Sequence, residues 1–141
     1  MSDRPKLGYV GIGLMGAPMA LRLLAAGYDL SVWNRSPGKL KAVVAKGAQA
    51  LGSAAEVARS ADIIMMCVTD QQAAEIVLFG PDGIAEGGSK GKLVVDFSSI
   101  APASARAYAE RLEAEQGMGL VDAPVSGGVI GAEQGSLAIM A

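Results

Sequence analysis

The chain has 141 residues, 51% of them hydrophobic and 18% charged, which is the size of one domain with enough apolar content for a packed core, so intrinsic disorder is excluded. Its formal net charge of −2, with no basic block, argues against a nucleic-acid partner or an anionic membrane surface. Histidine is absent and Cys67 is the single cysteine, which excludes an intrachain disulfide, a zinc site of the usual Cys/His type and histidine acid–base catalysis.

Short apolar runs alternate with helical patterns along the chain. In chain order, the predicted elements are strand 7–10, helix 14–26, strand 30–33, helix 37–46, a short helix after Ser53, strand 63–68, helix 71–78, strand 93–97, helix 103–115 and strands 120–121 and 137–140. Local chemistry supports the boundaries: Gly27 suits a helix C-terminus, Pro37 a first helical turn and Ser53 an N-cap. The alternation predicts an α/β fold with a mostly parallel sheet and helices on both faces.

The segment Gly11-Ile12-Gly13-Leu14-Met15-Gly16 follows the first strand, opens the first helix and matches the pattern G-x-G-x-x-G. In a dinucleotide site the first glycine permits the tight turn, the second lets the backbone approach the pyrophosphate, and the third lets the helix pack on the strand. The helix N-terminus adds free N–H groups and the positive end of a dipole. A glycine-rich turn that binds nothing is the alternative, but the strand and helix context favours dinucleotide binding by these six residues.

The end of the second strand indicates which dinucleotide is bound. NAD-binding domains usually place Asp or Glu about 20 residues after the glycines, on the ribose 2′-hydroxyl, whereas this region reads Trp33-Asn34-Arg35-Ser36. The Arg35 guanidinium suits a 2′-phosphate, Asn34 and Ser36 can add hydrogen bonds, and Lys39 can add charge. A solvated loop cation is the alternative role for Arg35. We expect NADP(H) as the cofactor, with NAD(H) possible.

Three segments together resemble the β-hydroxyacid dehydrogenase family. This family includes 3-hydroxyisobutyrate dehydrogenase, tartronate semialdehyde reductase (2-hydroxy-3-oxopropionate reductase) and the glyoxylate and succinic semialdehyde reductases. It is related to 6-phosphogluconate dehydrogenase. Residues 9–20 resemble the family's N-terminal signature, because Met15 and Pro18-Met19-Ala20 match as well as the glycines. Asp122-Ala123-Pro124-Val125-Ser126-Gly127-Gly128 resembles its substrate-binding segment, and Asp96-Phe97-Ser98-Ser99 resembles its D-x-S-T motif. The resemblance implies a Rossmann-like fold.

The resemblance also implies roles for residues outside the glycine segment. Cys67, Val68 and Thr69 correspond to residues that line the path of the adenosine and the nicotinamide ribose. Ser99 replaces the threonine that lies beside the nicotinamide, and it keeps the hydroxyl. Ser126, Gly127 and Gly128 correspond to the receptor for the substrate carboxylate, a role that a hydroxyl and close backbone N–H groups suit. An ordinary Gly-Gly turn is the alternative for that last segment.

Four further residues have simpler interpretations. Asp96 and Asp122 are not interpreted as a catalytic carboxylate pair, because both lie at strand ends, where an acid often caps a turn or the next helix. Cys67 lies in an apolar run and is interpreted as a small hydrophobic residue rather than a nucleophile. Arg22 stands where many family members have Asn, and we expect it to affect helix packing rather than chemistry.

The family's catalytic acid/base is a lysine on a helix tens of residues beyond the Ser-Gly-Gly segment, and none of the lysines here has that position, so no catalytic residue is assigned. The chain ends within the strand-like run 137–141, whereas natural termini are usually polar. We therefore expect residues 1–141 to be one NAD(P)-binding domain, truncated before the helical C-terminal domain through which the parent protein would form homo-oligomers.

The resulting hypothesis is a parent oxidoreductase that interconverts a small 3-hydroxy acid and its aldehyde acid, while the isolated chain binds the cofactor without turnover. An imine reductase is one alternative, although imine reductases do not usually carry the Asp-Ala-Pro-Val-Ser-Gly-Gly segment. A non-catalytic dinucleotide-binding sensor or scaffold is another. The N-terminus lacks a secretory signal, and the longest apolar run, 63–68, is far shorter than the ~20 residues that span a bilayer, so we expect a cytoplasmic protein without a membrane partner.

Overall fold

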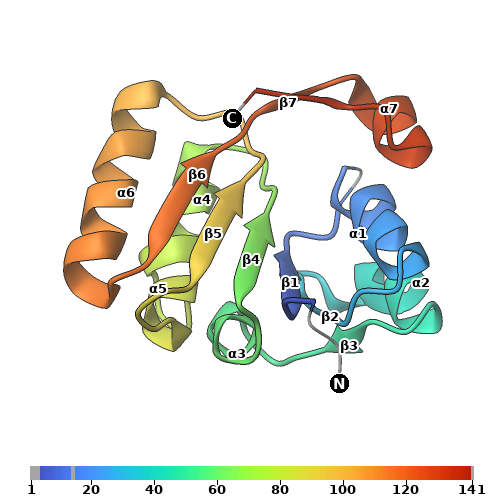
Figure 1. Ribbon diagram of the computed structural model, residues 1–141, viewed down its shortest axis with the longest axis horizontal. Coiled ribbons are helices and arrows are strands. Elements are labelled where there is room, and N and C mark those ends of the chain that lie inside the picture. The colour runs from blue at the N-terminus through green and yellow to red at the C-terminus, as the bar shows by residue number, and fades with distance from the viewer. Residues whose placement is uncertain (1–3, 14, 141) are drawn as a thin grey trace.

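The computed structural model describes residues 4–13 and 15–140, apart from the side chain of Val129. Strands and helices alternate along most of the described chain (Figure 1). The elements are β1 (Leu7–Val10), α1 (Gly16–Ala25), β2 (Leu30–Trp33), the 3₁₀ helix η1 (Pro37–Leu40), α2 (Lys41–Ala45), β3 (Gln49–Ala50), α3 (Ala54–Ser60), β4 (Ile63–Met66), α4 (Gln71–Phe79), α5 (Ile84–Gly87), β5 (Leu93–Asp96), α6 (Pro102–Gln116), β6 (Gly119–Asp122), β7 (Val125–Ser126), α7 (Gly128–Gln134) and β8 (Ala138–Ile139).

Six strands form a parallel sheet in the order β3-β2-β1-β4-β5-β6. The chain builds outward from β1 in one direction and then, after crossing to β4, in the other, which is the doubly wound Rossmann arrangement. The fold class predicted from the sequence is confirmed. In such a sheet the crevice outside the carboxyl ends of the strands, where the winding reverses, is the usual place for a ligand.

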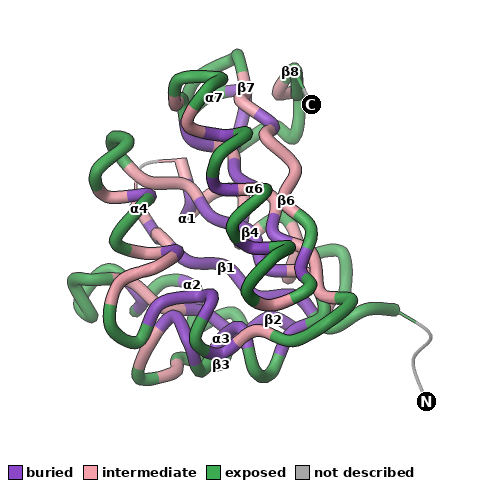
Figure 2. The backbone as a smooth tube through the Cα atoms, turned by 90° about the vertical axis from the view of Figure 1, so that its left-hand side faces the viewer, coloured by how far each residue is buried: buried purple, intermediate pink, exposed green. Residues whose placement is uncertain are grey.

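Two apolar cores lie on opposite faces of the sheet. Alternate residues along each strand supply them, so that in β4 Ile64 and Met66 join the core under α3, α4, α5 and α6, while Met65 joins the core under α1 and α2. A parallel strand buried on both faces is expected to be apolar throughout, as β4 is. Figure 2 shows β1 and β4 as buried segments, and β8 as exposed near the C-terminus.

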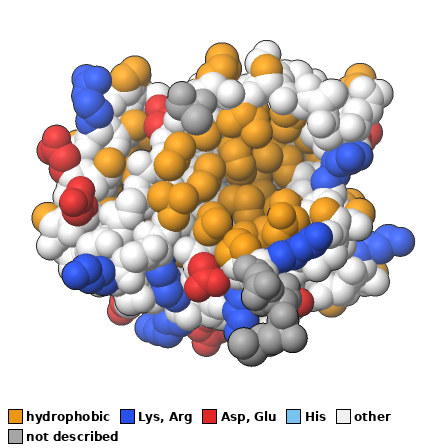
Figure 3. Space-filling model, viewed as in Figure 1, with side chains coloured by type: hydrophobic (Ala, Val, Ile, Leu, Met, Phe, Trp, Pro, Cys, Tyr) orange, Lys and Arg blue, Asp and Glu red, His pale blue; other side chains and the backbone are white. Residues whose placement is uncertain are grey.

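The α1–α2 face is only partly covered. The two helices pack over β1 and β2. Three apolar residues beside this core stay partly exposed: Ile63 of β4, Val95 of β5 and Phe97, which follows β5. Figure 3 shows hydrophobic side chains gathered in a hollow in the middle of this face. Among the described residues, no helix has the length and apolarity needed to cross a membrane.

Several elements differ from those predicted. The helix expected over 37–46 starts as η1 and continues as α2, and the strand expected over 63–68 stops at Met66. Four short elements of two to seven residues were not predicted: β3, α5, β7 and α7. The strand expected over 137–140 is present as β8, but it pairs antiparallel with β7 in a separate two-stranded sheet. The start of the helix expected over 14–26 involves Leu14, which lies outside the described residues.

Candidate functional site

An open pocket of about 530 Å³ lies at the carboxyl ends of β1, β2 and β4, where the winding of the sheet reverses. Eight residues that the sequence assigned to cofactor binding line it: Gly11, Gly13, Asn34, Arg35, Ser36, Cys67, Val68 and Thr69. The pocket therefore brings together three segments that are far apart in the sequence.

One wall of the pocket was not predicted. Ala73, Ile76 and Val77 of α4 line it, and Ile76 is 56% exposed although it is apolar. Their i, i+3, i+4 spacing places them on one helix face, and that spacing was the available sequence signal. Trp33 and Lys39 complete the side formed by the end of β2 and η1.

The three glycines of the loop have different surroundings. Gly11 has a φ of +97°, and a Cβ there would lie 2.2 Å from the Cys67 carbonyl oxygen. A Cβ on Gly16 would lie 2.1 Å from the Gly11 carbonyl oxygen and 3.2 Å from the Tyr9 ring. At Gly13, by contrast, no described residue other than its chain neighbours lies within 4 Å of an added Cβ. This pattern fits a dinucleotide, since two glycines serve the fold and the middle one leaves space for a ligand at the backbone.

Asn34 ties the glycine loop to the end of β2. Its side-chain oxygen accepts a hydrogen bond from the Ile12 N–H at 3.0 Å, and its side-chain nitrogen donates to the Ser36 carbonyl at 3.0 Å. Ile12, which was also predicted to bind the cofactor, is fully buried and does not line the pocket. Asn34 thus shapes the site as well as lining it.

The cationic side of the pocket is formed by Arg35 and Lys39. Both side chains are exposed, and neither forms a hydrogen bond or ion pair within the part of the chain that the structure describes. No acidic residue lies in the first turn of α1, whose N-cap is Met15, so that turn supplies no negative side chain to offset the positive end of the helix. Leu14, also predicted to bind the cofactor, lies outside the described residues.

The wall formed by residues 67–69 is held by the neighbouring strands. The Cys67 N–H donates to the Val10 carbonyl at 3.1 Å, and the Val68 N–H donates to Ser98 Oγ at 2.8 Å. Burial, and secondarily the charge of Asp96, raise the pKa of the Cys67 thiol. This supports the interpretation of Cys67 as a neutral, small apolar residue rather than a nucleophile.

The remaining predicted residues lie outside the pocket lining. Ser99 is exposed in the loop after β5. Ser126 ends β7, Gly127 has a φ of +129°, and Gly128 starts α7 with a φ of +61°; all three are exposed.

The segment that begins with Ser126 is anchored through α7. The Arg22 guanidinium of α1 donates to the Glu133 carbonyl at 3.2 Å, and a Cβ on Gly135 would lie 2.6 Å from that guanidinium. The packing role expected for Arg22 is therefore what the structure contains: it joins α1 to the C-terminal end of α7.

Asp96 and Asp122 are closer than their sequence separation suggests. They are direct partners across the β5–β6 ladder, so their side chains project from the same face of the sheet. Asp96 is fully buried, and its Oδ1 accepts the Ser98 N–H at 2.8 Å, which is the turn cap expected from the sequence. Oδ2 of Asp96 and Oδ1 of Asp122 are buried without a hydrogen-bond partner among the described residues. This adjacency was not predicted from the sequence.

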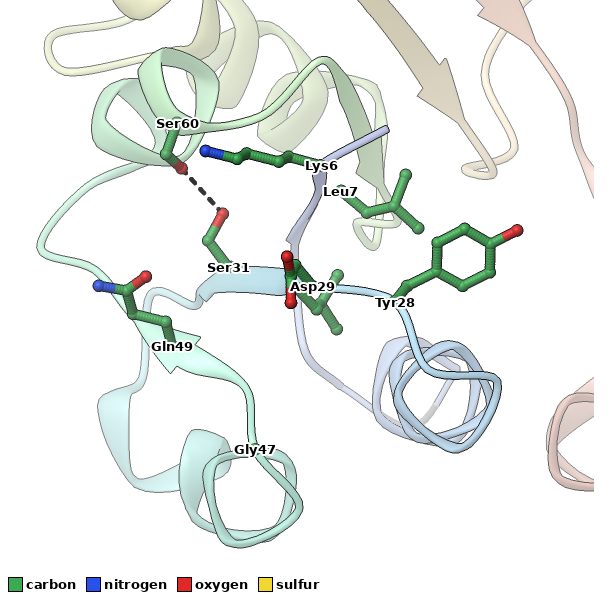
Figure 4. A pocket seen from close by; sticks show the side chains of 9 residues that line it. Lys6, Leu7, Tyr28, Asp29, Ser31, Gly47, Gln49 and Ser60 are labelled. Atoms are coloured by element: carbon green, nitrogen blue, oxygen red, sulfur yellow. Dashed lines mark hydrogen bonds between the residues drawn. The ribbon is translucent and has the colours of Figure 1, made fainter. Parts of the chain in front are cut away.

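A second, smaller pocket of about 290 Å³ lies at the opposite edge of the sheet, at the amino ends of β1 and β2. Figure 4 shows the Ser31 and Ser60 side chains pointing toward each other across it, with their hydroxyl oxygens 3.1 Å apart. None of the residues predicted to bind a ligand lines it.

Comparisons with known proteins agree with this geometry. Residues 6–141 match the family described as the NAD binding domain of 6-phosphogluconate dehydrogenase. The chain is 42% identical to 2-hydroxy-3-oxopropionate reductase from Escherichia coli (strain K12), over 96% of this chain and 46% of that protein. The chain thus spans about half the length of the curated relatives it matches.

Solved structures give the same result. The structure of 3-hydroxyisobutyrate dehydrogenase from Salmonella typhimurium superposes with a TM-score of 0.88 at 34% identity, covering 96% of this chain and 47% of that one. An imine reductase from Myxococcus stipitatus in complex with NADP+ superposes with a TM-score of 0.80 at 28% identity, covering 90% and 43%. Two different kinds of named oxidoreductase therefore share this fold.

Proposed function

The chain belongs to the family of the NAD binding domain of 6-phosphogluconate dehydrogenase, and from this premise we propose that it is the cofactor domain of an NADP(H)-dependent oxidoreductase that interconverts a small 3-hydroxy acid and its aldehyde acid. The observation that carries the proposal is the pocket lined by the open Gly13 backbone and by Arg35 and Lys39, two cations whose side chains have no partner among the described residues. When bound, the cofactor supplies or accepts the hydride.

Within this proposal the protein's own groups bind and orient the dinucleotide. The backbone at Gly13 and the N-terminus of α1 receive the pyrophosphate, because free N–H groups and the helix dipole both favour an anion there. Arg35 pairs with the 2′-phosphate, with Ser36 and Lys39 beside it. The apolar face of α4, with Ile76 exposed, gives a flat base a surface on which to pack.

The substrate side of the proposal rests on Ser126, Gly127 and Gly128. A hydroxyl followed by two glycines with positive φ offers closely spaced donors that suit a carboxylate. The relative named 2-hydroxy-3-oxopropionate reductase supports a small carboxylic acid as the substrate. The proposal also assigns the Ser99 hydroxyl to a position beside the nicotinamide.

The proton donor is assigned to the part of the parent protein beyond these residues. The chain spans 46% of the length of its Escherichia coli relative, so the proposal places a lysine and the oligomer contacts in the other half. We accordingly expect the 141-residue chain to bind NADPH and to show no aldehyde-dependent NADPH consumption. In a longer protein, activity on cyclic imines but not on aldehyde acids would favour an imine reductase, and cofactor binding without any turnover would favour a sensor.

The test is a titration of the chain with NADPH and with NADH. Arg35→Ala should weaken NADPH binding by about tenfold, or about 1.4 kcal/mol, and leave NADH binding nearly unchanged, because only NADPH carries the 2′-phosphate. Arg106→Ala, which removes an exposed cation of α6 away from the pocket, is the charge-matched control and should change neither affinity. An equal loss for both dinucleotides in Arg35→Ala would refute the role given to Arg35.

A further inference from the structure

The aspartate pair behind the pocket wall has an unbalanced set of hydrogen-bonding groups. Oδ2 of Asp96 and Oδ1 of Asp122 are both buried, both acceptors when ionised, and both without a partner in residues 4–13 and 15–140. No Lys or Arg is paired with either carboxyl in the described chain. Two ionised carboxylates on neighbouring strands would therefore repel each other with no cation to offset them, and each would leave a buried oxygen unsatisfied.

A single proton removes both penalties. A neutral carboxyl at one aspartate becomes a donor, and the unpartnered oxygen of the other is the acceptor on the adjacent strand. Burial first, and then the negative charge of Asp122, raise the pKa of Asp96, while the hydrogen bonds from the Ser98 side chain and backbone oppose that rise. Burial and the charge of Asp122 therefore favour the neutral form of Asp96, in agreement with the geometry.

The pair is connected to the pocket through one residue. The Ser98 N–H donates to Asp96 Oδ1, and Ser98 Oγ accepts the Val68 N–H, both at 2.8 Å. Ser98 is 2% exposed, so water does not compete for these bonds. Val68 lines the pocket next to Cys67 and Thr69.

We propose that Asp96 and Asp122 share one proton, and that this singly protonated pair acts as a positioning device that fixes Val68 in the pocket wall through Ser98. The proton sharing stands on the sheet geometry alone, and the effect on cofactor binding rests on the function proposed above. The proposal assigns no catalytic role to either aspartate.

The pair makes a prediction about pH. Asp96 holds its proton longer in the folded than in the unfolded chain, so its contribution to stability is complete below the unfolded Asp pKa of about 3.9 and is lost as pH rises through the folded pKa. Among the described residues, three other titratable groups interact electrostatically with Asp96: Cys67 after β4, Tyr9 on β1, and Tyr108 on α6, which also interacts with Glu75 of α4. The pKa of each of the three is raised mainly by burial, so all three are neutral where the pair titrates.

The first experiment follows the aspartate side-chain carbons by ¹³C NMR in the 141-residue chain. At pH 6 we expect one carboxyl of the pair to give the chemical shift of a neutral acid, and this signal should be lost in Asp96→Asn or Asp122→Asn. Asp62→Asn, at the amino edge of the sheet, where Asp62 accepts the Lys6 N–H, is the matched control and should leave the signal unchanged. Two ionised carboxyls at pH 6 in the wild-type chain would overturn the shared proton.

The second experiment measures hydrogen exchange at the Val68 amide together with the NADPH dissociation constant. Asp96→Asn keeps an acceptor for Ser98 and a donor for Asp122, so both values should stay within about twofold of wild type at pH 6. Ser98→Ala keeps the carboxyl pair but removes the acceptor of the Val68 N–H, so exchange should quicken at least tenfold and NADPH should bind at least fivefold more weakly. Wild-type exchange at Val68 in Ser98→Ala would overturn the positioning role. Failure of the wild-type chain to bind NADPH would reject the proposed function. The carbon chemical shifts would still test the shared proton, and the exchange rates would still test the positioning of Val68.

Discussion

Gly16 and Gly13 show how the same residue type can serve the fold at one position and a ligand at another. The sequence motif predicts both tasks, and the structure separates them by the space around each backbone. At Gly16 the nearest atoms belong to the Gly11 backbone and the Tyr9 ring, which packs against Phe97 with a centroid distance of 6.4 Å. The backbone at Gly16 therefore leaves no room for a side chain.

Gly16→Ala should therefore destabilise the fold. The new Cβ would lie 2.1 Å from a backbone oxygen, so α1 must shift away from the loop, and overpacking of this kind costs about 1–3 kcal/mol. Chemical denaturation of wild type and variant measures the difference directly. An unfolding midpoint equal to that of wild type would show that α1 is not packed against the loop as described.

At the scale of elements, the sequence predicts best where periodicity is strong. Strands β1 and β2 have the predicted bounds, because each is a four-residue run whose side chains enter both cores. Strand β3 escaped prediction because both of its residues are exposed, which leaves no apolar pattern to detect. Helix α5 is a single turn after a Gly-containing segment and has no amphipathic period of its own.

The adjacency of Asp96 and Asp122 illustrates a different limit. Each residue was recognised as lying at a strand end, but their proximity depends on β5 and β6 being neighbours in a fixed register. Single-strand patterns contain no information on which strand lies beside which, or on the residues that face each other. The same is true of Asn34 and Ile12, whose hydrogen bond joins two loops 22 positions apart.

Helix α7 should depend on Arg22 for its local stability. Arg22→Ala removes the guanidinium that donates to the Glu133 carbonyl and packs against Gly135, while leaving the sheet intact. We expect amide exchange in α7 to quicken by several-fold, corresponding to about 1 kcal/mol for a lost hydrogen bond. Exchange in β4 and β5 should stay unchanged and serves as the internal control. Unaltered exchange in α7 would mean that other contacts hold this helix.

For the whole molecule, the doubly wound sheet explains why three distant segments meet at one pocket. The winding starts at β1 and reverses at β4, so the loops after β1, β2 and β4 all lie at the same edge. The same topology leaves part of the α1–α2 face apolar and partly exposed (Figure 3). In the proposed function, the half of the parent protein beyond these residues supplies the missing catalytic group.

The most direct measurement is an NADPH titration of the wild-type chain and Gly13→Ala, each with its unfolding midpoint. Among the described residues beyond its chain neighbours, alanine at position 13 meets no atom within 4 Å. It also meets no backbone strain, because the φ of Gly13 lies outside the left-handed region, so the midpoints should agree. The new Cβ instead enters the space assigned to the pyrophosphate, so NADPH should bind at least tenfold more weakly, or by about 1.4 kcal/mol. Equal NADPH affinity in the two folded chains, or no NADPH binding by the folded wild-type chain, would contradict the assignment of this pocket to a dinucleotide.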